Sequence, residues 1–147
     1  MKKRIVITIC ALLALTAVIA SVYLLTREKV PENSLLVKTQ NGSVSLSIND
    51  LELSDVSGET VNKKGETKKI EAKGYSLSDI PELAGISEYS EVCVFSDDEY
   101  NASVSSDELS DHGKAWLITE DEGLRLIVFG DSDSKRNVKN VVRIEIR

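Results

Sequence analysis

Three cations near the C-terminus, Lys135, Arg136 and Lys139, are the side chains best placed by type and spacing to do chemistry. They follow a loop of small and acidic residues, 130–134, and precede an apolar run that predicts a strand. Backbone N–H groups of a loop, together with Lys or Arg side chains, form concavities that bind phosphate and other anions. The sequence therefore predicts an anion site here. The alternative is that these cations only offset the aspartates of the neighbouring loop.

Residue counts argue against most other chemistry. His112 is the only histidine, so we expect no zinc or iron site of known type. A Ser/His catalytic pair is not expected, because the sequence places His112 in a turn far from any candidate nucleophile. Cys93 lies in an apolar strand and Cys10 in the apolar N-terminal run, so no disulfide framework is expected. The acidic clusters lack the spacing of a calcium loop and are interpreted as solvated turns.

The first 27 residues predict a membrane anchor. Ile5–Leu25 is a run of 21 residues without a charge, and about 20 apolar residues span a bilayer core as a helix. A cleaved signal peptide, cut before Ser21, is the alternative, although its apolar core is usually shorter. The basic residues 2–4 outnumber those just after the run, so we expect a single-pass protein of the cell membrane with its domain on the extracytoplasmic side.

Charge divides the chain unequally. The first 27 residues hold four of the 18 cations and none of the 24 acids, so the remainder carries a net charge of −10. Nucleic acid and anionic lipid are therefore not expected as bulk partners. An anionic small molecule or a redox protein remains possible as a local partner of the basic C-terminal segment.

The rest of the chain predicts one α+β domain with mostly antiparallel sheets. We assign residues 28–43 to a linker and first strand, and residues 44–147 to the domain. Alternating or apolar runs between turn residues predict strands. The strands expected in the domain are 44–48, 56–62, 67–73, 91–96, 100–105, 115–119, 124–129 and 141–146.

Short helices are expected at three places. A capped turn is predicted at 49–52, and a capping box predicts another at 105–108. The strongest helix candidate is 76–85, in which Leu77, Ile80 and Leu83 share a face. In the last strand we expect Val142, Ile144 and Ile146 to face the core.

The order of segments in the domain resembles that of a known family. Residues 73–86 look like a G-[VFY]-x-L-x-x-[IL]…AG[IV] block, and residues 92–104 look like the V-x-V-x-x-x-D-G-Y-x-A-x-V hairpin that follows it. Segments 108–109, 124–128 and 134–141 complete the pattern. Together they resemble the oxidoreductase molybdopterin-binding domain, the catalytic domain of the sulfite oxidase family.

The resemblance implies a fold, a cofactor and a site. It implies mixed sheets with short helices, and a Lys/Arg loop that embraces the pterin phosphate. Lys135, Arg136 and Lys139 would face molybdopterin, with Arg125 and Tyr100 nearby. The cysteine that holds molybdenum in the family is absent from residues 61–68, so no metal site is assigned.

Three functions follow as expectations. The first is a membrane-anchored binding module for an anionic small molecule or a redox partner, without molybdenum catalysis. The second is an active molybdopterin-dependent oxidoreductase with unusual metal ligation. The third is a structural cell-surface domain.

Overall fold

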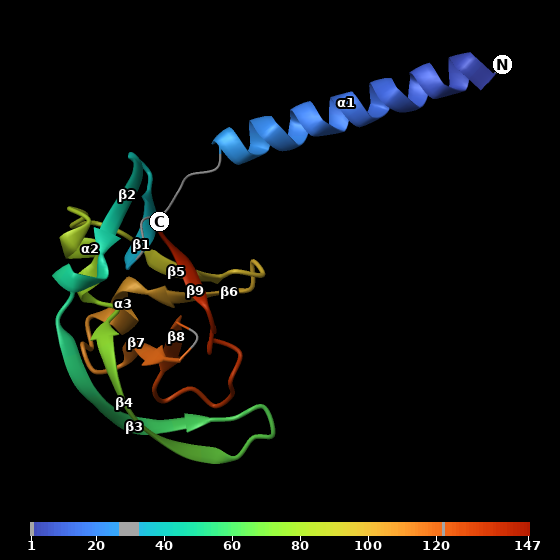
Figure 1. Cartoon of the computed structure of the whole chain (residues 1–147). Coiled ribbons are helices and arrows are strands. Elements are labelled where there is room, and N and C mark those ends of the chain that lie inside the picture. The colour runs from blue at the N-terminus through green and yellow to red at the C-terminus, as the bar shows by residue number, and fades with distance from the viewer. Residues whose placement is uncertain (1, 27–32, 122) are drawn as a thin grey trace.

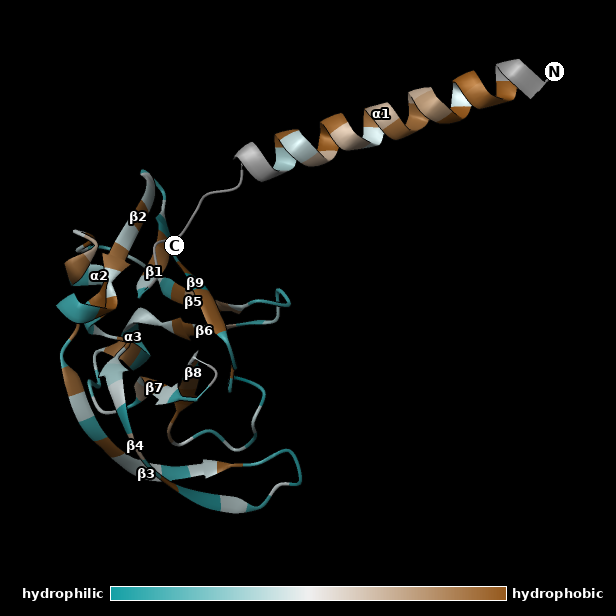
Figure 2. Cartoon of the chain, in the orientation of Figure 1, coloured by the Kyte–Doolittle hydropathy of each residue, from teal (hydrophilic) through white to brown (hydrophobic). Residues whose placement is uncertain are grey.

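The computed structural model describes residues 2–26, 33–121 and 123–147. Helix α1, Lys2–Thr26, contains the apolar run, and hydrophobic positions recur along its length (Figure 2). Its window Ile5–Tyr23 is long and apolar enough to cross a membrane, and none of it is buried against the domain. The helix therefore agrees with a membrane anchor and equally with a signal sequence. Most of the predicted linker, residues 28–32, lies outside the described residues.

The described part of the domain consists of two sheets (Figure 1). One has the order β2-β1-β9-β5-β6, in which β1 and β9 form the one parallel pair among the described strands. The other has the order β3-β4-β7-β8 and is antiparallel throughout. The mixed α+β class with mostly antiparallel sheets is thus confirmed. The bounds are β1 Ser34–Thr39, β2 Gly42–Ser47, β3 Leu53–Val61, β4 Thr67–Ser76, β5 Glu91–Ser96, β6 Asn101–Ser105, β7 Ala115–Glu120, β8 Gly123–Val128 and β9 Val141–Ile146.

A single aliphatic core joins the two sheets. Fully buried side chains from both of them, such as Val94, Ile144, Leu117 and Leu126, belong to one cluster. Burial of such side chains contributes about 1.5–3 kcal/mol each relative to exposure, so this cluster is the main stabilising element. It also fixes where the loops at the strand ends lie.

Strands β3 and β4 form a long ribbon that leaves its sheet. They pair with each other over the whole of Leu53–Val61, whereas β4 pairs with β7 only at residues 74–76. Beyond that point the ribbon curves under the sheet (Figure 1), as two-stranded ribbons with strong twist do. It packs there through a second small cluster, which includes Val56, Ile118 and Ile127. The free end of the ribbon is thereby carried away from the main core.

Two of the three expected short helices form close to their predicted positions. A 3-10 turn, η1, spans Ile48–Asp50, so it begins one residue earlier than expected, and Ser47 caps it. Helix α3, Ser106–Leu109, has the capping box formed by Ser105 and Glu108. Both helices are too short to form without these caps and the packing around them.

Helix α2, Asp79–Leu83, is shorter than the predicted 76–85. Ser76 still belongs to β4, and the late start places Pro81 in the first turn, where its missing N–H costs little. Gly85 ends the helix with a φ of 74°. Leu83 is 45% exposed, so the expectation that it shares a buried face with Ile80 is wrong, because a single turn buries only one side.

Strand β9 differs from its predicted pattern at one residue. Ile144 and Ile146 are buried as expected, but Val142 is 43% exposed and Val141 takes the inward position. The pairing with β5 shifts between Phe95 and Ser96, and such an irregularity moves a side chain to the opposite face. This difference lies at the start of β9, directly after the loop that carries Lys135, Arg136 and Lys139.

Candidate functional site

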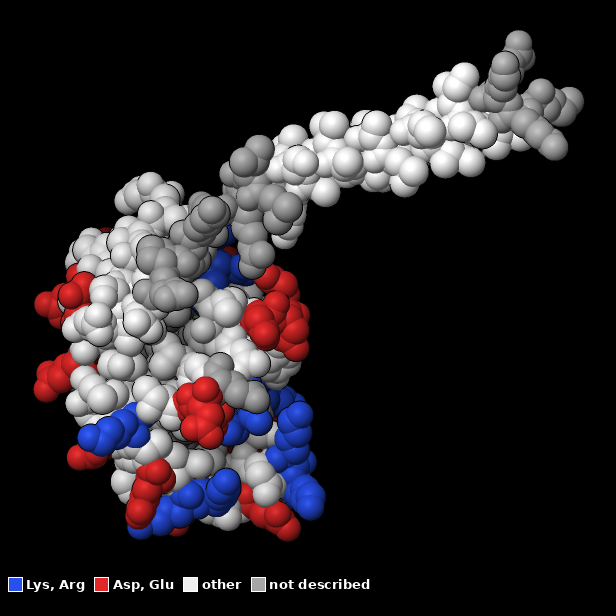
Figure 3. Space-filling model, viewed as in Figure 1, with Lys and Arg blue, Asp and Glu red and all other residues white. Residues whose placement is uncertain are grey.

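The end of the β3–β4 ribbon faces the loop that precedes β9, and a hollow of about 740 Å³ lies between them. We call it the basic hollow. Its third side is the β5–β6 turn, residues 96–100. Basic side chains gather over the ribbon end and the neighbouring loop, at the lower right of Figure 3. The lining residues are Thr60, Val61, Asn62, Lys63, Lys64, Lys68, Ile70, Ser96, Asp97, Asp98, Tyr100, Arg125, Ser134, Asn137, Lys139 and Asn140.

Hydrogen bonds connect the three sides of the hollow. Asn137 Nδ2 donates to Thr60 Oγ1 at 3.4 Å, which joins the loop to the ribbon. The Asp97 N–H donates to the Asn140 carbonyl at 3.2 Å, which joins the loop to the β5–β6 turn. Val138 is fully buried beneath the loop, and its carbonyl accepts from Leu126 N–H at 2.8 Å. The hollow is therefore built by tertiary contacts between segments far apart in the sequence.

The ribbon end owes its shape to Asn62. Its Oδ1 accepts from the backbone N–H groups of Lys64 and Glu66, at 2.8 and 3.0 Å. Gly65 completes the turn with a φ of 80°, which favours glycine. This side-chain-stabilised turn holds Lys63 and Lys64 at the rim of the hollow.

Four lysines of the hollow have no carboxylate partner among the residues that the structure describes. Within the described part of the chain, no ion pair joins Lys63, Lys64, Lys68 or Lys139 to an acid. Arg125 differs, because its Nη1 donates to Glu120 Oε1 at 3.0 Å. Its Nε is buried and has no hydrogen-bond acceptor among the described residues. The hollow therefore keeps several positive charges uncompensated in a domain that is acidic as a whole.

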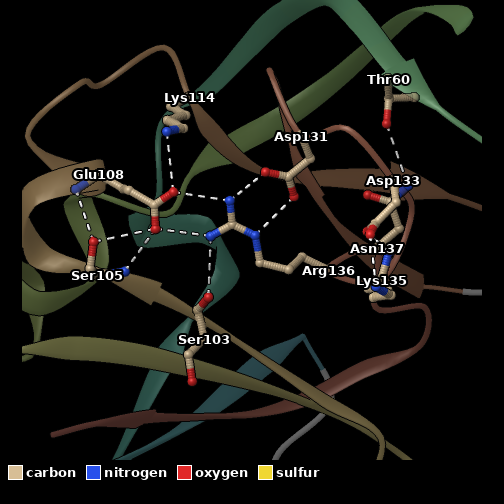
Figure 4. Close-up of polar contacts among 10 residues, drawn as sticks. All are labelled: Thr60, Ser103, Ser105, Glu108, Lys114, Asp131, Asp133, Lys135, Arg136 and Asn137. Carbon is tan, nitrogen blue, oxygen red and sulfur yellow. Dashed lines mark hydrogen bonds and ion pairs between the residues drawn. The ribbon is translucent and has the colours of Figure 1, made fainter.

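Arg136 lies outside the hollow and is held by carboxylates on both sides (Figure 4). Its guanidinium donates to both oxygens of Asp131 and to both oxygens of Glu108, the latter at 2.9 Å each. Lys114 Nζ lies 3.1 Å from the same Glu108. Hydrogen bonds from Arg136 hold the pKa of Glu108 at about 2, against 4.5 for a free group. Such a doubly bidentate arginine has little capacity left for a ligand.

Lys135 and Tyr100 also interact within the protein. Lys135 Nζ lies 3.0 Å from Asp133 Oδ2, and its side chain is 84% exposed. The Tyr100 hydroxyl donates to the Lys135 carbonyl, while the Tyr100 ring lines the hollow. The alternative interpretation of the basic cluster, that its cations offset loop acids, therefore describes Lys135 and Arg136. It does not describe Lys139.

The β5–β6 turn adds negative charge to one side of the hollow. Asp98 accepts hydrogen bonds from the Ser96 hydroxyl and the Tyr100 N–H, and these lower its pKa. Asp97 is exposed beside it. An anion in the hollow therefore interacts favourably with the ribbon and loop sides, and unfavourably with this turn.

The structure places the five predicted site residues in two different surroundings. Lys139, Arg125 and Tyr100 line the hollow, whereas Lys135 and Arg136 do not. The sequence reasoning missed Lys63, Lys64 and Lys68, which it treated as part of a hairpin. The cluster of lysines at the hairpin turn was a signal, but only the curved ribbon brings them to the loop.

The residues around the hollow do not fit a molybdenum centre. A soft thiolate is the ligand expected for this metal, and no cysteine lines the hollow. Cys93 is buried in β5, where its Sγ lies 3.1 Å from Ser103 Oγ, and burial raises its pKa. No group of three metal-binding side chains occurs among the described residues. The cations do fit a phosphate group, so the anionic part of the predicted ligand remains chemically reasonable.

His112 does not lie far from a hydroxyl, contrary to the sequence-based expectation. Its Nδ1 is 2.9 Å from Ser78 Oγ, which also contacts Ser76 Oγ at 2.6 Å. The expectation failed because residues 34 positions apart in sequence meet when α2 packs beside the 110–114 turn. A catalytic pair also needs a group that orients the imidazole, and none contacts its Nε2 in the ranges that the structure describes.

No protein-family model matches this chain, and a search of curated proteins finds no match either.

Proposed function

We propose that this chain is a membrane-anchored binding module whose basic hollow takes an anionic small molecule on the extracytoplasmic side. The observation that carries the proposal is the set of four lysines around one hollow of about 740 Å³, none of which forms an ion pair with a described carboxylate. Ligand sites are typically concave and measure about 300–1,000 Å³. A hollow of this kind encloses a small molecule better than it matches the surface of a redox protein.

The resemblance to the molybdopterin-binding domain supports an organic phosphate as one ligand class. The mixed α+β architecture is consistent with that resemblance, which implies that Lys139, in the loop before the last strand, would face the pterin phosphate. The missing thiolate argues for binding without molybdenum catalysis. Metal analysis of the purified chain separates a binding module from an active molybdopterin-dependent oxidoreductase, because about one equivalent of molybdenum would favour the oxidoreductase.

Ligand-dependent thermal stability tests the proposal. A ligand at ten times its Kd stabilises the folded state by about 1.4 kcal/mol, which raises Tm by roughly 5 °C for a domain of this size. We expect such a rise when inorganic phosphate is added to the full-length chain in detergent. Ionic strength must be held constant with KCl, so that charge screening does not contribute.

Matched variants assign the effect to the hollow. The double variant Lys64→Gln, Lys139→Gln should lose the phosphate-dependent rise. Lys69→Gln removes one positive charge from the ribbon, but Lys69 pairs with Glu71 and does not line the hollow, so the phosphate-dependent rise in Tm should persist in this variant. A phosphate response that is absent in the unmodified chain, or equal in all three proteins, would contradict an anion site in the hollow.

A further inference from the structure

We propose that the ligand of the basic hollow is a linear polyphosphate-type anion that contacts the lysines of the ribbon and of the loop at the same time. The inference rests on the proposed function and specifies the chemistry of its ligand. It starts from the positions of the uncompensated charges.

The cations come from separate segments of the chain. Lys63, Lys64 and Lys68 belong to the ribbon end, and Lys139 belongs to the loop before β9. The Asn137–Thr60 hydrogen bond joins these two sides without any charge. A ligand with one compact charge can neutralise one side of such a site, whereas an extended anion can neutralise both.

The volume of the hollow agrees with an extended ligand. About 740 Å³ lies in the upper part of the range for small-molecule sites, and a single phosphate group would fill a small part of it. Lysine ammonium groups are point charges on flexible stems, so they follow a chain of phosphates without needing a fixed geometry. Their mutual repulsion, which no ion pair among the described residues offsets, would be reduced by such a ligand.

The acidic β5–β6 turn determines where the phosphates lie. Asp97 and Asp98 line the hollow from the β5–β6 turn, and the Asp97 N–H donates to the carbonyl of Asn140, the residue after Lys139. Repulsion from these carboxylates keeps the anion on the ribbon and loop sides. Removing the Asp97 charge should therefore tighten binding. Asp97 is the better choice for this change, because Asp98 accepts hydrogen bonds that shape the turn.

Calorimetric titration of the full-length chain in detergent tests the inference. The probes are inorganic phosphate and inorganic triphosphate, compared at constant ionic strength. We expect triphosphate to bind at least tenfold more tightly than phosphate. Lys64→Gln and Lys139→Gln should each weaken triphosphate binding by about three- to tenfold, because one ligand contacts both sides.

Two further variants complete the design. Asp97→Asn should tighten triphosphate binding by about two- to threefold, and Lys69→Gln should leave it unchanged. Each variant should retain the Tm of the unmodified chain without ligand, since all four side chains are exposed.

The outcomes separate this inference from the proposed function. If phosphate binds but triphosphate binds no more tightly, the hollow is an anion site and the polyphosphate inference is wrong. The same holds if only one of the two lysine variants weakens triphosphate. If neither anion binds, both proposals fail.

Discussion

At the scale of single residues, the cations of the basic C-terminal segment divide into two kinds. Arg136 is a structural residue, because Asp131 and Glu108 engage its guanidinium from both sides (Figure 4). Lys139 is exposed and has no such partner in the described ranges. The difference arises because a planar guanidinium matches two carboxylates, whereas a lysine at the loop end reaches solvent.

Replacing Arg136 should destabilise the domain. Arg136→Gln leaves Asp131 and Glu108 close together, with side chains only 15% and 28% exposed and their main cation removed. Breaking a buried ion pair costs about 3–5 kcal/mol, and partial exposure here reduces that to about 2–3 kcal/mol. Urea unfolding of Arg136→Gln measures the loss. Lys135→Gln is the control and should change the free energy of unfolding by less than about 0.5 kcal/mol.

Acid should weaken the same network through Glu108. Its pKa is lowered from 4.5 to about 2 in the folded state, so its contribution to stability is complete above pH 4.5 and is lost as pH falls toward 2. Allowing for its partial exposure, we expect the contribution to be about 1–2 kcal/mol. Unfolding free energies measured from pH 6 to pH 2.5 test this. The free energy of unfolding of Glu108→Gln should fall less steeply with decreasing pH than that of the unmodified chain. An equal slope for the two proteins would assign the acid sensitivity to other groups.

At the scale of elements, the β3–β4 ribbon decides whether the hollow exists. The ribbon approaches β8 so closely that a Cβ on Gly58 would lie 2.6–2.8 Å from ring atoms of Phe129. Only a residue without a side chain permits this approach. Gly58 therefore lets the ribbon lie directly against the Phe129 ring.

Gly58→Ala should both destabilise the domain and weaken anion binding. The added methyl group forces the ring or the ribbon to move, which costs about 1–3 kcal/mol in a packed region. Denaturant unfolding and the phosphate-dependent rise in Tm measure the two effects. Ser57→Ala, at the exposed neighbouring position, should change neither.

A second substitution tests whether contact with the Phe129 ring causes the destabilisation. Phe129→Leu removes the ring that the new methyl group of Gly58→Ala would meet. The double variant should therefore lose less unfolding free energy than the sum of the two single losses. Strict additivity would show that the destabilisation arises from the strand backbone and not from Phe129.

At the scale of the whole molecule, the apolar helix α1 and the charge of the chain predict a tethered domain outside the membrane. The three basic residues 2–4 before the apolar window Ile5–Tyr23 outnumber those just after it, which favours a cytoplasmic N-terminus. The domain beyond it carries an excess of acids, which suits a position near a like-charged membrane surface. A retained anchor would keep the basic hollow near the membrane.

Selective thiol labelling should confirm the orientation. Cys93 is buried with a raised pKa, so the domain contains no reactive exposed thiol of its own among the described residues. Ser43 is exposed on β2, and Ser43→Cys should react with a membrane-impermeant maleimide added to intact cells. Labelling that requires lysis would place the domain in the cytoplasm. Intact mass of the labelled protein also shows whether residues 1–20 are retained.

Local patterns in the sequence were sufficient to predict most elements. The alternation of apolar and polar residues predicted the hairpins, and the spacing of Ser105 and Glu108 predicted the cap of α3. These features depend on neighbours in the chain, so they are visible without a fold. The pattern of β9 was wrong at Val142, because an irregular pairing with β5 cannot be seen from β9 alone.

The composition of the candidate site was decided only by the tertiary structure. The sequence determined that Lys139 follows a loop and that Lys63 and Lys64 lie in a turn, about 75 residues earlier. It could not determine that the ribbon curves across the sheet to bring them around one hollow, because that path depends on contacts between distant segments, such as Gly58 with Phe129. Nor could it determine which cations remain free, because pairing depends on which carboxylates the folded chain places within reach.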